Sequence, residues 1–254
     1  MKQTILITGA GSGLGRGLGL CLAREGHAII ATDLNRERAE ETAAQIAAAG
    51  GEAKAGALDV TSEADVRLFW DKLAESPVSV LINNAGLQHV ARVEEFPVEQ
   101  WDLLLGVMIR GPFLMIRAAL PGMRARGFGR IVNIGSIHSH VASPFKSAYV
   151  SAKHALIGFS KTVALETAGA DITCNTVCPA YVRTPLVDAQ IRDQALQRGI
   201  SEDEVIGRIM LDPMPKKTFI TIEEIAAAAE YLISPLARNV TGQTLTIDGG
   251  WTAQ

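Results

Sequence analysis

Tyr149 and Lys153 are the pair of residues whose types and spacing most directly suggest chemistry. They lie four positions apart in a stretch, residues 148–166, that is predicted to be helical, so one turn places both on the same face. An ammonium group beside a phenol stabilises the phenolate. Lowering a tyrosine pKa from about 10 to about 7 requires about 4 kcal/mol. A cation about 5 Å away supplies about 3 kcal/mol at an effective dielectric constant of about 20. A positively charged cofactor ring can supply the rest, so the pair can exchange a proton near neutral pH.

Ser136 can assist the same reaction, because it directly follows a predicted strand at residues 130–135. Its hydroxyl group can hydrogen-bond the substrate oxygen that exchanges a proton with Tyr149. A Tyr-x-x-x-Lys pair alone is usually an ordinary pair of neighbours on a helix surface. The catalytic interpretation therefore depends on the motifs that accompany it.

A glycine-rich turn joins the predicted strand Thr4–Thr8 to a helix that continues to Glu25. Gly9, Gly13 and Gly15 permit a tight turn and let a pyrophosphate approach the backbone and the positive end of the helix. A glycine-rich string is weak evidence alone, but here it has the strand before it and the helix after it that a dinucleotide site requires.

Asp33 follows the second predicted strand, residues 27–32. An acidic side chain at this position can accept hydrogen bonds from an adenosine ribose and would repel a 2′-phosphate, which favours NAD over NADP. The alternative is that Asp33 only caps the next helix. Arg16 and Arg36 are close enough in sequence to weaken the preference, but NAD remains the expected cofactor.

Strands and helices alternate along the chain, which predicts an α/β fold with a parallel sheet covered by helices on both faces. A further strand is expected to end at residues 58–60, and others are expected to span residues 78–83, 130–135, 172–178 and Thr244–Ile247. Further helices are expected over residues 37–49, 63–75, 100–123 (bent or ended near Pro121), 148–166 and 223–233. Residues 180–219 are rich in proline and interrupt the alternation, so we expect a substrate lid there.

Composition limits the classes of protein that remain. The chain has 254 residues, 48% of them hydrophobic, enough for one large core and a single domain over residues 1–254. A net charge of −3 gives no reason to propose nucleic acid or an anionic membrane as a partner. No apolar run approaches the roughly 20 residues that cross a bilayer, and little sequence precedes the first strand, so we expect no signal peptide and a cytoplasmic location.

Three cysteines, Cys21, Cys174 and Cys178, fit a reduced compartment, and the last two are expected to pack in the core. The histidines, including His138 and His140, lack the third ligand of a metal motif. We therefore expect no catalytic metal.

Four motifs occur in order: Thr8-Gly9-x-x-x-Gly13-x-Gly15, Asn83-Asn84-Ala85-Gly86, Ser136 and Tyr149-x-x-x-Lys153. Together they resemble the short-chain dehydrogenase/reductase family from end to end of the chain. The resemblance implies a doubly wound Rossmann sheet of seven strands, a nicotinamide cofactor, a homotetramer, and reversible hydride transfer between a carbonyl and an alcohol. It also implies that Tyr149 is the general acid/base, that Lys153 holds the nicotinamide ribose and tunes the tyrosine, and that Ser136 positions the carbonyl.

The resemblance implies a set of cofactor-binding residues drawn from these motifs and from the ends of the strands. The set is Thr8, Gly9, Gly13, Leu14, Gly15, Asp33, Asp59, Val60, Asn84, Ala85, Gly86, Tyr149, Lys153, Pro179, Val182 and Thr184.

Met108 departs from the family pattern, which usually has an asparagine at this place in the helix after Trp101. The family's asparagine is thought to hold a water that relays protons to the lysine, and a thioether cannot replace its amide. Met108 either packs the helix while backbone carbonyls and water complete the relay at a reduced rate, or catalysis is lost and the protein only binds nucleotide.

Several further stretches, residues 86–89, 141–149, 165–169, 178–187 and 248–253, resemble bacterial D-3-hydroxybutyrate dehydrogenases within that family. The resemblance implies NAD-dependent interconversion of (R)-3-hydroxybutyrate and acetoacetate. A 3-oxo acid requires donors for its carboxylate while its ketone meets the tyrosine. The implied substrate-binding residues are Gln88, Ser136, His138, Lys146, Tyr149, Tyr181, Gln190 and Trp251.

Some of these roles have simpler alternatives. Lys146 would otherwise be a solvated charge, and Trp251 a core or interface residue. Tyr181 stands where those enzymes commonly have a tryptophan, and it adds a hydroxyl group to the aromatic wall. Another small ketone or secondary alcohol also remains a possible substrate, because fold-level similarity does not determine the substrate.

Overall fold

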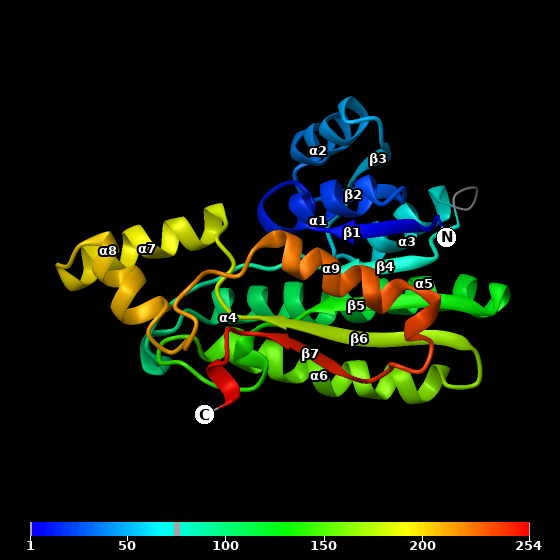
Figure 1. Cartoon of the computed structure of the whole chain (residues 1–254). Helices are drawn as coiled ribbons and strands as arrows, with labels where there is room; N and C mark the ends of the chain where they lie inside the picture. Colours follow the sequence, from blue (N-terminus) through cyan, green and yellow to red (C-terminus); the bar gives the residue numbers. More distant parts are fainter. Residues whose placement is uncertain (1, 74–76, 254) are drawn as a thin grey trace.

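The computed structural model describes residues 2–73 and 77–253, and a sheet of seven parallel strands runs through it (Figure 1). The strands are β1 (Thr4–Thr8), β2 (Ala28–Asp33), β3 (Glu52–Ala57), β4 (Val80–Asn83), β5 (Phe128–Ile134), β6 (Asp171–Pro179) and β7 (Thr244–Ile247). Their order, β3-β2-β1-β4-β5-β6-β7, reverses direction between β1 and β4. The doubly wound Rossmann fold is therefore confirmed, and ligands bind such sheets in the crevice at the carboxyl ends of the strands beside the reversal.

Helices cover both faces of the sheet. They are α1 (Gly13–Arg24), α2 (Arg36–Ala48), α3 (Glu63–Lys72), α4 (Val98–Leu105), α5 (Gly111–Arg126), α6 (Ser147–Thr167), α7 (Pro185–Arg198), α8 (Glu202–Val205) and α9 (Ile222–Ile233). Side chains along a strand point alternately to the two faces. Accordingly, Ile5 and Ile7 of β1 pack with α1, α2 and α9, whereas Leu6 packs with α3, α5 and α6.

The helix expected over residues 100–123 differs from its prediction in two ways. Pro121 neither ends nor interrupts α5, which continues to Arg126. Pro121 is exposed, so solvent can take over the hydrogen bond that its missing N–H leaves unmade. The irregularity lies earlier, in a π-helical turn, η2 (Gly106–Arg110), between α4 and α5. Single π-helical turns occur frequently at functional sites, and this one contains Met108.

Two other boundaries were predicted too far along the chain. β3 ends at Ala57, so residues 58–60 follow the strand instead of ending it. Helix α3 ends at Lys72, and the last predicted residues of this helix, 74 and 75, lie outside the described part of the chain.

The expectation that no run is long and apolar enough to span a membrane was wrong. The continuous helical run Val98–Arg126 has 29 residues and meets that test by length and composition alone. In the fold, however, Leu114, Met115 and Ile116 of this run pack against the sheet in the core. The core helix of a soluble protein passes the same test, so the finding is weak evidence for membrane insertion.

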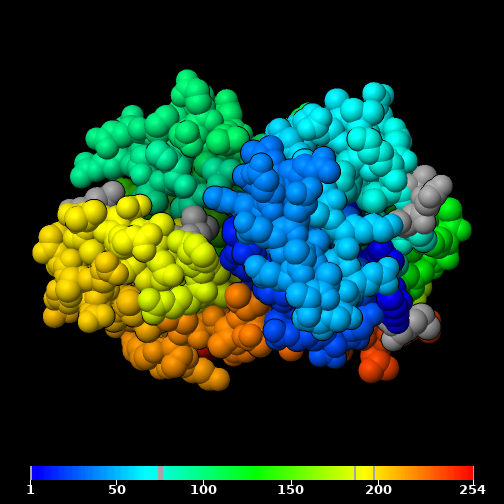
Figure 2. Space-filling model, turned by 90° about the horizontal axis from the view of Figure 1, so that it is seen from above, coloured from blue at the N-terminus to red at the C-terminus, as the bar shows by residue number. Residues whose placement is uncertain are grey.

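Residues between β6 and α9 form an excursion from the sheet that contains α7, α8 and a second π-helical turn, η4 (Ile206–Met210). Its helices have a small apolar cluster of their own, with Ile191 and Val205 at its centre. An isolated bridge between Val182 and Ile220 closes the base of the excursion. In Figure 2 this segment, in yellow, forms a lobe beside the blue N-terminal part, with a hollow between them. Its action as a substrate lid stays a prediction.

Candidate active site

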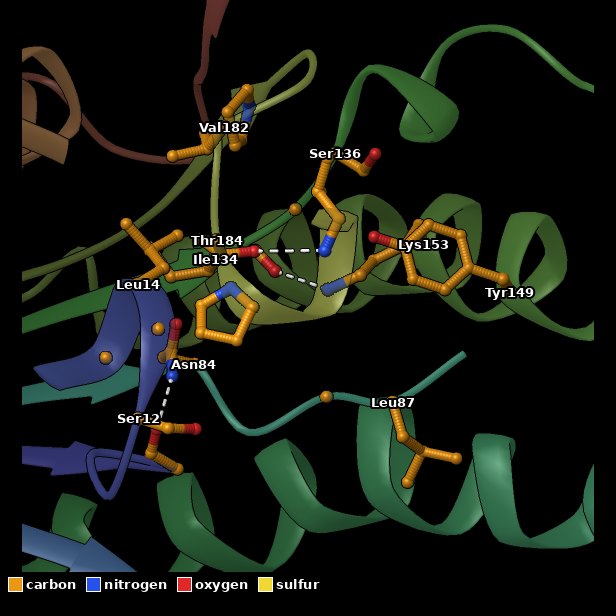
Figure 3. A pocket seen from close by; sticks show the side chains of 18 of the residues that line it. Ser12, Leu14, Asn84, Leu87, Ile134, Ser136, Tyr149, Lys153, Val182 and Thr184 are labelled. Atoms are coloured by element: carbon orange, nitrogen blue, oxygen red, sulfur yellow. Dashed lines mark hydrogen bonds between the residues drawn. The ribbon is translucent and has the colours of Figure 1, made fainter. Parts of the chain in front are cut away.

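A cleft with a volume of about 330 Å³ opens at the carboxyl ends of β1, β4, β5 and β6, where the strand order reverses (Figure 3). Its floor is backbone at the glycine-rich turn. A Cβ atom on Gly15 would lie 2.3 Å from the Gly9 carbonyl oxygen and 2.4 Å from the Asn84 side-chain nitrogen. Gly13 has a φ of +52°, in the left-handed region that favours glycine. The absence of these side chains therefore lets the turn pack tightly beside the N-terminus of α1, the end of a helix that suits a pyrophosphate.

Most of the residues predicted to bind the cofactor line this cleft. They are Gly9, Gly13, Leu14, Gly15, Asp33, Asn84, Gly86, Tyr149, Lys153, Pro179, Val182 and Thr184. The cleft also contains residues that the sequence analysis missed: Ser12, Leu87, Ile134, Gly135, Ala180, Pro185 and Val187. Each of these is within three positions of a predicted residue, so proximity in sequence to the motifs was the available signal.

Thr8 and Ala85 do not line the cleft but fix its shape. The Thr8 hydroxyl accepts hydrogen bonds from the backbone N–H groups of Asn84 at 3.0 Å and of Ala85 at 3.1 Å. In return, the Asn84 side chain donates to the Thr8 carbonyl at 2.9 Å and to the Gly9 carbonyl at 3.1 Å. These bonds hold the ends of β1 and β4 together at the reversal.

Asp59 and Val60 also lie outside the cleft walls. Asp59 Oδ1 accepts hydrogen bonds from the backbone N–H of Thr61 at 2.8 Å and from its hydroxyl at 2.7 Å. Val60 is buried in the core and packs close to Gly111, whose Cβ atom would lie 3.0 Å from it. Contacts of Asp59 and Val60 with a cofactor stay predictions.

Asp33, at the end of β2, lies beside the glycine-rich turn. Its Oδ2 accepts a hydrogen bond from the Gly11 N–H at 2.9 Å. Arg16 forms an ion pair with Glu41 at 2.9 Å, and Arg36 pairs with the glutamate four residues further along α2 at 2.8 Å. Arg16 and Arg36, the two arginines close enough in sequence to weaken the preference for NAD, therefore both have carboxylate partners.

Helix α6 presents Tyr149 and Lys153 to the cleft, and Ser136 faces them from the end of β5 (Figure 3). The Lys153 ammonium is buried and donates a hydrogen bond to the Ile134 carbonyl at 2.6 Å. It lies 5.6 Å from the centroid of the Tyr149 ring. The structure thus brings together the three residues predicted to be catalytic.

The pKa values of Tyr149 and Lys153 depend on burial as well as on nearby charge. Burial raises the pKa of Tyr149, and its hydrogen bond with Ser136 opposes that shift. Burial lowers the pKa of Lys153 to about 8. Desolvation, which disfavours the phenolate, is a contribution that the pairwise charge argument from sequence did not include.

Met108 is buried in the π-helical turn, beneath the catalytic face of α6. It packs with Leu104, Ala148 and Ala152. Its sulfur lies 3.8 Å from the position that a Cβ atom on Gly86 would occupy. The thioether therefore fills the space between α6 and the loop after β4 and brings no N–H or O–H donor to it.

A second cavity, with a volume of about 90 Å³, adjoins the cleft at Ser136 and Tyr149. Residues predicted to bind substrate line it together: Gln88, Ser136, His138, Lys146, Tyr149, Tyr181 and Gln190. Trp251, also predicted to bind substrate, does not line the cavity but packs against two residues that do. Its ring stacks on Tyr181, with centroids 6.1 Å apart, and meets the edge of His138 at 6.2 Å.

Lys146 is the cationic side chain of this small cavity. Burial lowers its pKa to about 8, and no carboxylate among the described residues forms an ion pair with it. His138 is buried, and its Nε2 lies 2.8 Å from the Ser143 hydroxyl. Burial, together with the charge of Lys146, lowers the His138 pKa to about 3, so this imidazole is neutral. The cavity therefore favours a small anion.

Both cysteines of β6 are buried, as predicted. Cys174 belongs to the core, and burial raises its pKa to about 12. Burial also raises the pKa of Cys178. Within residues 2–73 and 77–253, no group of three His, Cys, Asp or Glu side chains is placed to hold a metal ion.

Comparison with known proteins gives consistent results. A family model described as enoyl-(acyl carrier protein) reductase matches residues 9–252. A D-beta-hydroxybutyrate dehydrogenase of Rhizobium meliloti is 44% identical, with both chains covered completely. One from Cupriavidus necator is 40% identical over 99% of this chain and 98% of its own. A 2-(R)-hydroxypropyl-CoM dehydrogenase of Xanthobacter autotrophicus is 36% identical over the whole of both chains.

Proposed function

This chain is an oxidoreductase of the short-chain dehydrogenase/reductase family, and from that premise we propose that it interconverts (R)-3-hydroxybutyrate and acetoacetate with NAD as cofactor. The observation that carries the proposal is the half-buried Lys146, without a carboxylate partner among the described residues, in a small cavity that Tyr149 and Ser136 also line. Two relatives named D-beta-hydroxybutyrate dehydrogenase support it. We further propose a cytoplasmic homotetramer.

The residues of the large cleft fit a nicotinamide dinucleotide. The N-terminus of α1 and the close approach at Gly15 suit a pyrophosphate. Asp33 suits a ribose with free hydroxyl groups, which favours NAD. When bound, the cofactor accepts a hydride from the alcohol or donates one to the ketone.

Tyr149 is proposed to move the hydroxyl proton. In the oxidation direction the Tyr149 oxygen takes the proton from the alcohol, and in the reduction direction it returns it. The Ser136 hydroxyl donates a hydrogen bond to the same substrate oxygen and holds it beside the tyrosine. Lys153, fixed by the Ile134 carbonyl, supplies the positive charge that favours the phenolate during the reaction. Burial otherwise disfavours that phenolate, so a cationic nicotinamide ring in the cleft would assist proton removal.

Lys146 is proposed to bind the substrate carboxylate, with the amides of Gln88 and Gln190 as additional donors. The neutral His138 contributes one hydrogen-bonding ring nitrogen and no charge. A carboxylate held at this end of the cavity places the ketone of a short 3-oxo acid near Tyr149.

Met108 leaves the proton relay without the family's amide. We propose that water and backbone carbonyls near Lys153, including that of Ile134, complete the relay at a reduced rate. If catalysis were lost instead, the protein would bind NADH but turn over no ketone in a substrate panel.

The direct test is the absorbance of NADH at fixed enzyme concentration with (R)- and (S)-3-hydroxybutyrate, repeated with NADP. We expect reduction of NAD with the R acid, and much slower reactions with the S acid and with NADP. Equal rates with the two acids would overturn the stereochemical assignment.

A second candidate is the oxidation of another small secondary alcohol, because one relative is named for a different substrate. Lys146→Ala separates the two. A large rise in KM for acetoacetate supports the acid, and an unchanged KM supports the other alcohol.

A further inference from the structure

Tyr181 is held firmly at the wall of the substrate cavity. One face of its ring stacks on Trp251, with an interplanar angle of 27°. Its carbonyl accepts a hydrogen bond at 2.9 Å from the N–H of Ile220, at the base of the excursion. The position of its hydroxyl group is therefore set by contacts on the ring and on the backbone.

The hydroxyl group of Tyr181 faces the same charge that the substrate is proposed to use. Lys146 Nζ lies 3.5 Å from the Tyr181 oxygen, which is longer than the roughly 2.8 Å of a strong charge-assisted hydrogen bond. Nζ also lies 5.5 Å from the centre of the Tyr181 ring. Both groups line the cavity, so an anion that enters it can contact both.

The protonation states suit a shared anion. Burial raises the pKa of Tyr181 to about 12, so its O–H remains a donor at neutral pH. The oxygen can accept a hydrogen bond from Lys146 while its own proton points elsewhere. Lys146 is half-buried and has no carboxylate partner among the described residues, so it gains from an incoming anion, and a neighbouring O–H donor adds a second bond to that anion.

We propose that Tyr181 determines specificity: its hydroxyl group binds the substrate carboxylate directly, together with Lys146. The proposal rests on the proposed function and deepens it. A tryptophan, usual at this position in the enzymes that the chain resembles, has no hydroxyl to offer. This chain would thus add a donor to its carboxylate site.

The test is the dissociation constant of acetoacetate for the complex of the full chain with oxidised NAD, measured by calorimetry. Oxidised NAD has no hydride to donate, so the ketone binds without turnover. Tyr181→Phe should weaken binding about ten-fold, the usual loss for one hydrogen bond to a charged group. Methyl acetoacetate, the neutral ester, should be affected less than two-fold.

Tyr231→Phe is the matched control, because it removes the hydroxyl of a half-exposed tyrosine on α9 that does not line the cavity. It should leave both dissociation constants unchanged. Wild-type affinity in Tyr181→Phe would overturn the proposal.

A Lys146→Met background separates direct contact from mere support of the lysine. If the Tyr181 hydroxyl touches the carboxylate, Tyr181→Phe weakens binding further in that background. If it acts only by holding Lys146, the second substitution changes nothing, and the proposal fails. A wild-type enzyme that binds acetoacetate but does not oxidise (R)-3-hydroxybutyrate would overturn the proposed function alone. A wild-type enzyme that binds no acetoacetate would overturn both.

Discussion

The cofactor cleft and the substrate cavity meet at Tyr149 and Ser136, yet they are built in different ways. The cleft is shaped largely by backbone, at the glycine-rich turn and at the ends of β1 and β4. The cavity is shaped by side chains from separate segments: Gln88 after β4, Lys146 before α6, and Tyr181 after β6. Backbone recognition suits a ligand common to a whole family, whereas side chains can change one at a time and alter the substrate.

The two regions also differ in charge. The cleft offers the N–H groups of a helix N-terminus to the pyrophosphate. The cavity instead offers Lys146, a half-buried ammonium whose pKa burial lowers to about 8. Binding of the substrate carboxylate should therefore depend on pH through this side chain.

The largest effect on activity is expected from a substitution of Tyr149, where the cleft and the cavity meet. Tyr149→Phe removes the proton carrier, so kcat should fall about 1,000-fold, the usual range for general acid–base catalysis. The dissociation constant for NADH, measured by fluorescence, should change less than three-fold. A kcat within ten-fold of wild type would show that another group carries the proton.

A substitution confined to the cleft should mainly weaken the binding of the cofactor. In Gly15→Ala the new methyl group would lie 2.3 Å from the Gly9 carbonyl oxygen, so the turn must shift. We expect NADH to bind about 100-fold more weakly, because the turn no longer fits the pyrophosphate. Gly158→Ala is the matched control, since no atom lies within 4 Å of its added Cβ, and it should bind NADH normally. Equal NADH affinities in the two variants would contradict a backbone-built cleft.

A substitution confined to the cavity should mainly raise the KM for the substrate. Lys146→Met should raise KM for acetoacetate about 30-fold, because the carboxylate loses its cation. In the wild type the charged form of Lys146 is present below its pKa of about 8 and is lost as the pH rises through it. KM should therefore rise more between pH 7 and pH 9 in the wild type than in the variant.

Lys153, whose pKa is also about 8, titrates in the same range. The readout is therefore the difference in KM between wild type and variant at each pH, because Lys153 is common to both. A difference in KM that stays constant between pH 7 and pH 9 would assign the titration to another group.

The smallest effect is expected at Met108. Met108→Asn should raise kcat about three-fold by restoring an amide to the proton relay. It should also lower the melting temperature by about 4 °C, because a buried apolar side chain becomes polar. Met108→Leu, which adds no amide, is the control and should leave kcat unchanged. A fall in kcat for the asparagine variant would mean that the relay is built around methionine.

The sequence was informative wherever a function depends on local backbone geometry. The glycine-rich turn, the Tyr149–Lys153 pair and the alternation of strands and helices follow from short-range patterns, and the structure brings the turn and the pair to the same edge of the sheet. Boundaries were less certain. The π-helical turn at Gly106–Arg110 escaped prediction because an apolar pattern does not reveal where a helix takes up one extra residue.

The sequence alone determined the fold class, the family and the residue types that meet at the site, because these depend on periodicity and on motifs of fixed spacing. The tertiary structure decided how those residues are charged. Desolvation depends on every neighbour that excludes water, which no spacing along the chain records. For that reason only the folded structure shows the direction of the Tyr149 pKa shift and the neutrality of His138. It also shows that Lys146 Nζ lies 3.5 Å from the Tyr181 hydroxyl oxygen.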